Sequence, residues 1–268
     1  MIRDITLGQY YPGHSAVHKL DARTKILGTF LYIIEVFLVN SFAGFGIVIL
    51  ALAAIIGISR VPVKFIFKGL KAVMFIIMLT FCINLFVFDG TVLWQWNFLT
   101  ITYEGVYKSF FMALRLILLI IGTSMLTLTT KPMELTDGLE KLLKPFERFG
   151  LPSHEIALMM TIALRFIPTL LEETDKIMKA QQARGADFES GNLLERVKNM
   201  IPILIPLFVG SFRIAQDLAL AMEARCYHGG AGRTRMKEIA FGRRDGVAGV
   251  ILVLFLGVII ASRWLPLP

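Results

Sequence analysis

Long apolar runs with almost no charge are the feature that most restricts how this chain can fold. A helix that crosses the hydrocarbon core of a bilayer needs about 20 mostly apolar residues. The first run, residues 26–58, has 33 residues with a single charge, Glu35, and a break at Asn40 and Ser41, so it predicts two short spans. Three more spans are predicted at residues 71–88, 106–128 and 247–261. The chain is therefore predicted to be an all-α membrane protein with about five transmembrane helices.

The composition excludes several other classes of protein. Hydrophobic residues make up 56% of the chain and charged residues 18%, whereas soluble domains are less apolar and more charged. This balance argues against an ordinary soluble enzyme and against a disordered protein. The two cysteines, Cys82 and Cys226, form no C-x-x-C motif and no framework of disulfides.

A charged segment interrupts the apolar pattern between residues 131 and 245. It holds 17 Lys and Arg and 15 Asp and Glu, whereas the rest of the chain holds 11 and 5. We therefore expect three parts: residues 1–130 with an N-terminal segment and four transmembrane helices, residues 131–245 as a water-facing helical domain, and residues 246–268 with the last transmembrane helix.

Basic residues beside the spans predict the orientation in the membrane, because cytoplasmic loops are enriched in Lys and Arg. Four basic residues precede the first span and four lie in the segment 59–71, whereas the loop 89–105 has none. The N-terminus and residues 131–245 are therefore predicted to be cytoplasmic, in a multi-pass protein of the cell membrane.

The charged segment is itself predicted to be helical. Gly150 and Pro152 separate its first helix from a long one at residues 153–185, and a third is predicted at residues 192–225. Two stretches, 156–171 and 200–212, are unusually apolar. We expect them to pack on each other and against the inner face of the membrane, but a further transmembrane hairpin remains an alternative reading.

Motifs for catalysis or for cofactors are lacking in the sequence. There is no G-x-x-x-x-G-K-[ST] loop for nucleotide phosphates and no H-E-x-x-H pair for zinc. We therefore predict no catalytic residue, no metal site and no cofactor.

Two charges lie inside predicted spans, where each is expensive unless it is paired or hydrated. Glu35 lies near the outer end of the first span and Arg115 near the middle of the fourth. We predict that they meet inside the helix bundle. The alternative is that Glu35 reaches the outer interface and Arg115 binds backbone carbonyls.

A near-repeat closes the two long cytoplasmic helices. The first ends in Ala183, Arg184 and Gly185, and the second in Ala224, Arg225 and Cys226. Ordinary capping of helix ends by cations accounts for such a pattern, although Lys would serve equally well. The alternative is that two guanidinium groups, held on rigid helix ends, bind a cytoplasmic partner through planar bidentate contacts.

Several separated segments together resemble one family. Residues 11–25, Y-P-G-H-S-A-V-H-K-L-D-A-R-T-K, resemble the N-terminal signature of the T component (EcfT) of energy-coupling factor (ECF) transporters. The segment Arg165-Phe166-Ile167-Pro168, then Glu172-Glu173, then residues 180–185, A-Q-Q-A-R-G, is similar to that family's second coupling helix. The resemblance covers essentially the whole chain.

The resemblance implies a membrane scaffold without catalytic activity. EcfT proteins join two ABC-type ATPase subunits (EcfA and EcfA′) to a substrate-binding membrane subunit, the S component, for import of vitamins or transition metals. Two Ala-Arg-Gly motifs at the ends of long crossing helices dock one into each ATPase, which here assigns ATPase docking to Ala183, Arg184 and Gly185 and to Ala224, Arg225 and Cys226. Because Cys adopts the left-handed conformation less readily than Gly, we expect the second helix to continue into Tyr227.

The mechanism that follows needs a surface for the S component. We expect it on the apolar faces of the two long helices, with contacts from Met159, Met160, Leu164, Leu204 and Phe208. The competing interpretation is a self-sufficient permease or secondary transporter, which would need polar residues that converge at mid-membrane and a repeat between halves. Asn84, Arg115 and Glu35 are weak support for it.

Overall fold

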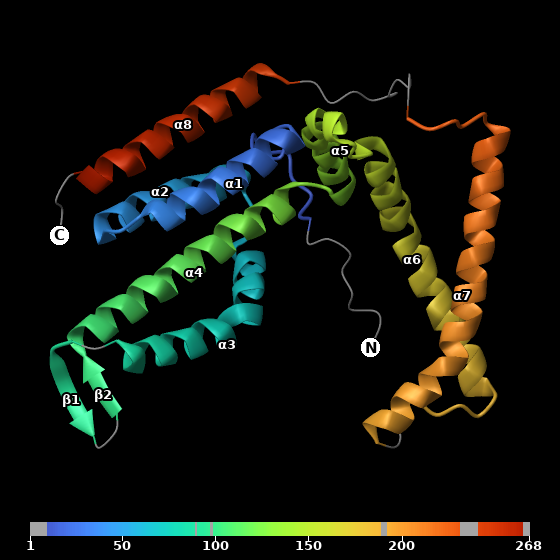
Figure 1. Ribbon diagram of the computed structural model, residues 1–268, viewed down its shortest axis with the longest axis horizontal. Helices are drawn as coiled ribbons and strands as arrows, with labels where there is room; N and C mark the ends of the chain where they lie inside the picture. Colours follow the sequence, from blue (N-terminus) through green and yellow to red (C-terminus); the bar gives the residue numbers. More distant parts are fainter. Residues whose placement is uncertain (1–9, 89, 97–98, 189–191, 231–240, 265–268) are drawn as a thin grey trace. The chain divides into compact units, whose positions relative to one another are not determined.

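The computed structural model describes residues 10–88, 90–96, 99–188, 192–230 and 241–264. Helices dominate this part of the chain (Figure 1). The elements in chain order are α1 (Ala22–Leu38), α2 (Phe42–Ser59), α3 (Val63–Val87), β1 (Val92–Trp96), β2 (Leu99–Thr102), α4 (Tyr103–Thr129), α5 (Pro132–Leu143), the 3₁₀ helix η2 (Lys144–Phe149), α6 (Ser153–Ala183), α7 (Leu193–Ala224) and α8 (Arg243–Trp264).

The contacts divide the chain into two compact units. Of the described residues, the membrane unit comprises those within 10–138 and 241–264, and the insert unit comprises those within 139–230. Six helices in the described residues are long and apolar enough to cross a membrane, by length and composition: α2, α3, α4, α6, α7 and α8. An all-α membrane protein is thereby confirmed. The predicted five spans included α1, which has 17 residues, and left out α6 and α7.

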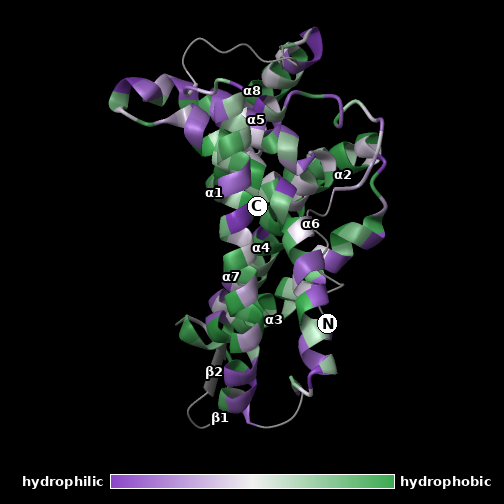
Figure 2. Ribbon diagram, turned by 90° about the vertical axis from the view of Figure 1, so that its right-hand side faces the viewer, coloured by the Kyte–Doolittle hydropathy of each residue, from purple (hydrophilic) through white to green (hydrophobic). Residues whose placement is uncertain are grey.

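Two elements differ from the predicted ones. The helix α3 begins at Val63, so Lys64, Lys68 and Lys71 lie on its first turns and not in a loop. The residues between α3 and α4 include an antiparallel hairpin, in which Val92 pairs with Thr102 and Trp96 with Leu99. Figure 2 shows that α3 and α4 are mostly hydrophobic along their length, whereas hydrophilic residues recur along α7.

The core of the membrane unit lies where α1, α2, α4 and α8 pack side by side. Its fully buried side chains include Val36 from α1, Phe45 and Val48 from α2, and Ile259 from α8. The Tyr32 hydroxyl donates to the Leu118 carbonyl at 2.9 Å, which joins α1 to α4. Many other apolar side chains of these helices are exposed, as expected where lipid replaces water.

The N-terminal signature lies against this bundle. The Tyr11 amide donates to the Leu128 carbonyl at 2.9 Å, and the Tyr11 ring packs 5.4 Å from that of Phe65. The His18 ring lies between the Ser15 hydroxyl and the Tyr11 carbonyl. Burial lowers the pKa of His18 below its usual value, with Lys25 adding to this effect and the bond to the Tyr11 carbonyl opposing it. A neutral ring that donates to Tyr11 and accepts from Ser15 fits this environment.

One carboxylate joins the starts of the first and last helices. Asp245 accepts a hydrogen bond from the Asp21 amide at 2.8 Å and one from the Gly242 amide at 2.9 Å. Asp21 is the N-cap of α1, and Gly242 immediately precedes α8. A negative charge is favourable at helix N-termini, where the first amides lack partners within the helix. Asp245 therefore holds two helix starts together although 224 positions separate it from Asp21.

We expect Asp245→Ala to destabilise the membrane unit by about 2 kcal/mol, because it leaves a buried amide without an acceptor. The thermal midpoint of the purified protein in detergent should fall by about 4–8 °C. Asp217→Ala, which removes an exposed carboxylate from α7, is the matched control and should leave the midpoint unchanged. Equal midpoints for the two variants would contradict the structural role of Asp245.

Candidate functional site

The helix α6 ends in a complete Schellman motif. Arg184 is the C-cap residue, and Gly185 follows with a left-handed φ of 89°. The Gly185 amide donates to the Gln182 carbonyl at 2.9 Å and the Ala186 amide to the Gln181 carbonyl at 3.0 Å. These two bonds satisfy carbonyls that the helix leaves unpaired at its end.

The helix α7 ends in the same way, although Cys226 replaces the glycine. Arg225 is the C-cap residue and Cys226 is left-handed, with a φ of 57°. The Cys226 amide donates to Glu223 at 2.8 Å and the Tyr227 amide to Met222 at 3.0 Å. The expectation that this helix continues into Tyr227 is therefore wrong. The same pair of hydrogen bonds stops the helix and offsets the strain of a left-handed residue that carries a side chain.

The two arginines consequently leave their helices from the same backbone position. Arg184 has φ −89° and ψ 7°, and Arg225 has φ −95° and ψ 15°. Both residues are exposed, and neither guanidinium forms an ion pair with an acidic residue in the part of the chain that the structure describes. An exposed guanidinium at a defined helix end, with no ion pair to a described residue, is suited to bidentate binding of a carboxylate from another protein.

The helices α6 and α7 run antiparallel, so the two arginines lie at opposite ends of the pair. The end of α6 contacts the first half of α7, where the Gln181 side-chain amide donates to the Pro202 carbonyl at 3.4 Å. Pro206 lacks the amide that would otherwise bond this carbonyl within α7. At the other end, Leu158 of α6 lines the same cavity as Arg225. At 1.5 Å per residue, the α6 residues between Leu158 and Arg184 place the arginines on the order of 40 Å apart.

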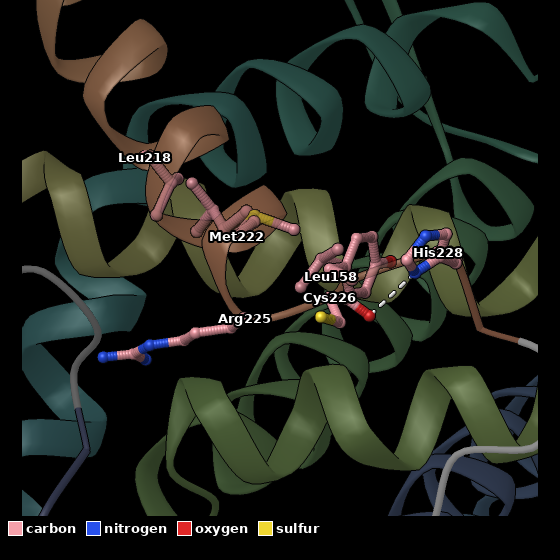
Figure 3. A pocket seen from close by; sticks show the side chains of 9 residues that line it. Leu158, Leu218, Met222, Arg225, Cys226 and His228 are labelled. Carbon is pink, nitrogen blue, oxygen red and sulfur yellow. Dashed lines mark hydrogen bonds between the residues drawn. The ribbon is translucent and has the colours of Figure 1, made fainter.

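An open cavity of about 370 Å³ lies beside Arg225. Its apolar wall consists of Leu158 and Ile162 from α6 and Leu218 and Met222 from α7, and the turn after α7 adds Arg225, Cys226, Tyr227, His228 and Gly229. His228 Nδ1 donates to the Cys226 carbonyl at 2.9 Å. Figure 3 shows the Arg225 side chain extending away from Leu158, Met222 and Cys226. This cavity was not predicted from the sequence, although both apolar pairs have the i,i+4 spacing of one helix face.

The residues predicted to contact the S component are distributed along the two helices. Met159, Met160, Leu204 and Phe208 are exposed, with Met159 at 61% and Phe208 at 63%, and Leu164 is half-buried. Exposed apolar side chains of this size normally contact lipid or another protein.

The structure does not pair Glu35 with Arg115. Arg115 Nη2 donates to the Val39 carbonyl at 2.7 Å, at the C-terminal end of α1. Glu35 is fully buried, and neither of its carboxyl oxygens has a hydrogen-bond partner in the described residues. The alternative expectation holds for Arg115, because the unpaired carbonyls and the dipole at a helix end attract a cation. It fails for Glu35, which does not reach the surface.

Comparison with known proteins gives one consistent result. Residues 13–237 match the CbiQ family, which is described as cobalt transport protein. The chain is 56% identical over 265 residues to the energy-coupling factor transporter transmembrane protein EcfT of Clostridium kluyveri, with 98% of both chains covered. It is 45% identical over 264 residues to the EcfT protein of Bacillus subtilis, which covers 98% of this chain and 100% of that one.

The two helix ends should respond in opposite directions to substitution at the left-handed position. Cys226→Gly relieves strain and should stabilise the end of α7 by about 0.5–1 kcal/mol, whereas Gly185→Ala should destabilise the end of α6 by a similar amount. Hydrogen exchange measured by mass spectrometry should therefore slow by about two- to fivefold around Tyr227 in the first variant and quicken around Ala186 in the second. Faster exchange in Cys226→Gly would contradict the conformation described for Cys226.

Proposed function

Because the chain belongs to the EcfT family of energy-coupling factor transporter transmembrane proteins, we propose that it is the scaffold that couples ATP hydrolysis by two ABC-type ATPase subunits to substrate uptake through an S component. The chain is a multi-pass membrane component of such a transporter. We propose in addition that its partners are the two ATPases and the S component, and that it couples them to each other. In this proposal the chain catalyses no reaction, and the ATPase activity resides in the partner subunits.

The observation that carries the proposal is the pair of matching helix ends. Each long helix stops in the same two-bond motif, and each presents one exposed arginine from the same backbone conformation. Capping alone would not need Arg at both positions, because Lys serves equally well near the last carbonyls. Two ends with the same backbone geometry support docking to two similar subunits, one on Arg184 and one on Arg225.

The antiparallel arrangement also bears on the position of these helices relative to the membrane. If α6 and α7 crossed the bilayer as a hairpin, Arg184 and Arg225 would lie on opposite sides of it. Only one of them could then meet a cytoplasmic ATPase. We therefore place both helices and the N-terminus on the cytoplasmic side, with the apolar faces of α6 and α7 turned toward the membrane and the S component.

In the proposed cycle, ATP closes the two ATPase subunits on each other, which displaces the ends of α6 and α7 that carry the arginines. Helices of 31 and 32 residues transmit this displacement over tens of ångströms to the apolar surface that holds the S component. Reorientation of the S component then releases the substrate.

Reversing the charge of either arginine should remove one ATPase. Arg184→Glu and Arg225→Glu should each weaken ATPase binding by about 30-fold or more, as expected when one partner of a buried charge pair is reversed. The protein should still insert into the membrane. Copurification of the tagged chain with the ATPase subunits measures the loss, and Arg213→Glu, at an exposed position of α7, is the control. Normal recovery of both ATPases with the double variant would refute the docking role.

The apolar surface can be tested separately from the helix ends. Phe208→Asp should reduce copurification of the S component by about tenfold or more, because a charge replaces a large apolar contact, and should leave ATPase binding intact. Leu220→Asp introduces the same charge at an equally exposed apolar position of α7 and is the matched control. Undiminished recovery of the S component with Phe208→Asp would remove this residue from the proposed contact.

A further inference from the structure

A cavity lies beside Arg225 at one of the two arginine ends of the insert unit, and the proposed role of the arginine does not by itself explain it. It lies between the facing stripes of two helices, with Leu158 and Ile162 on one side and Leu218 and Met222 on the other. Its volume of about 370 Å³ is large enough for a whole large side chain. A concave apolar surface of this kind next to an exposed cation is suited to a partner that offers both chemistries.

The turn that closes the cavity is held in place within the insert unit. Gly229 has a left-handed φ of 95°, and His228 bonds back to the Cys226 carbonyl. Gly230 lies so close to the His154 ring that an added methyl group would be 2.4 Å from His154 Cδ2. These contacts hold the turn in the conformation that lines the cavity.

The charges around the cavity indicate what kind of partner fits. Among the described residues that line the cavity, Arg225 carries a positive charge and none is acidic. Its guanidinium extends away from the apolar wall (Figure 3), so one partner can bind the guanidinium and fill the cavity together. The positions three and two residues before Arg225 are Met222 and Glu223. The equivalent positions before Arg184 are Gln181 and Gln182. The two docking ends thus share a backbone but differ in the side chains beside the arginine.

We propose that this cavity receives an apolar side chain of the ATPase that docks on α7, next to a carboxylate of the same subunit that binds Arg225. The inference rests on the proposed docking function and deepens it. Because the cavity lies at the α7 end, it gives that end a preference for the ATPase surface that presents an apolar residue beside an acidic one. The guanidinium orients the partner, and burial of the apolar side chain supplies affinity.

Filling the cavity tests the proposal. Leu218→Trp should weaken binding of the α7-docked ATPase by about tenfold or more, so that the chain in detergent retains one ATPase and not two by mass photometry. Leu220→Trp places the same indole on an exposed position two residues away and should retain both. Combining Leu218→Trp with Arg184→Glu should remove all ATPase, whereas combining it with Arg225→Glu should be no worse than Arg225→Glu alone.

The possible failures are distinguishable. Retention of both ATPases by Leu218→Trp, together with loss in the arginine variants, would overturn the cavity proposal and leave the docking function standing. Retention of both in the arginine variants themselves would overturn the docking function. Ile162→Trp fills the cavity from α6 and replaces Leu218→Trp if that variant loses its helix content by circular dichroism.

A measurement on the unfilled cavity completes the test. In a Cys82→Ser background Cys226 is the remaining thiol, and it is exposed and lines the cavity. Binding of the ATPase should slow its alkylation by N-ethylmaleimide about tenfold or more, and Arg225→Glu should abolish this protection. Equal alkylation rates with and without the ATPase would overturn the proposal. Protection by phospholipid vesicles alone would also overturn it, because the occupant would then be an acyl chain.

Discussion

The shared carboxylate of Asp245 is the contact on which the organisation of the chain depends. The chain leaves the membrane unit after Gly138 and returns to it by α8, so a long insert separates α8 from the helices with which it packs. The two bonds from Asp245 join the start of α8 to the start of α1 directly after this return. Since each helix start lacks acceptors for its first amides, one buried charge satisfies both at once. The membrane unit is thereby closed although the insert interrupts its sequence.

The insert unit uses backbone chemistry to fix the direction of its two arginines. The two hydrogen bonds of a Schellman motif end a helix at a specific residue. They therefore fix the position from which the C-cap side chain extends. The two ends have almost the same C-cap torsions although one uses Gly185 and the other Cys226. Two arginines with the same backbone geometry on antiparallel helices are the arrangement that the proposed docking to two ATPase subunits requires. The cavity beside Arg225 makes the two helix ends chemically different.

Sequence reasoning succeeded where a pattern is local. The break at Asn40 and Ser41, the apolar runs and the stop at Gly185 all depend on residues within a few positions of each other, and all were predicted. It failed where a side chain binds a partner that is distant in the sequence. Arg115 binds a backbone carbonyl on α1 and not the predicted Glu35, and the bond between Asp245 and Asp21 has no local signal. The left-handed conformation of Cys226 was missed for a different reason. Hydrogen bonds at the helix end override the conformational preference of a single residue there.

The prolines in α7 make its stiffness uneven. Pro202 and Pro206 each remove one bond of the helix ladder, and Figure 1 shows that α7 bends in its first half. From Leu207 to Ala224 the helix contains no proline, so this stretch keeps its full ladder of hydrogen bonds and is the stiffer part, with Arg225 at its end. The first half of α7, with two ladder bonds missing, is its more pliable part. Gln181, three residues before Arg184, donates to the Pro202 carbonyl there. The end of α6 that carries Arg184 is therefore fastened to α7 at its most pliable point, whereas Arg225 lies at the end of its stiffest stretch.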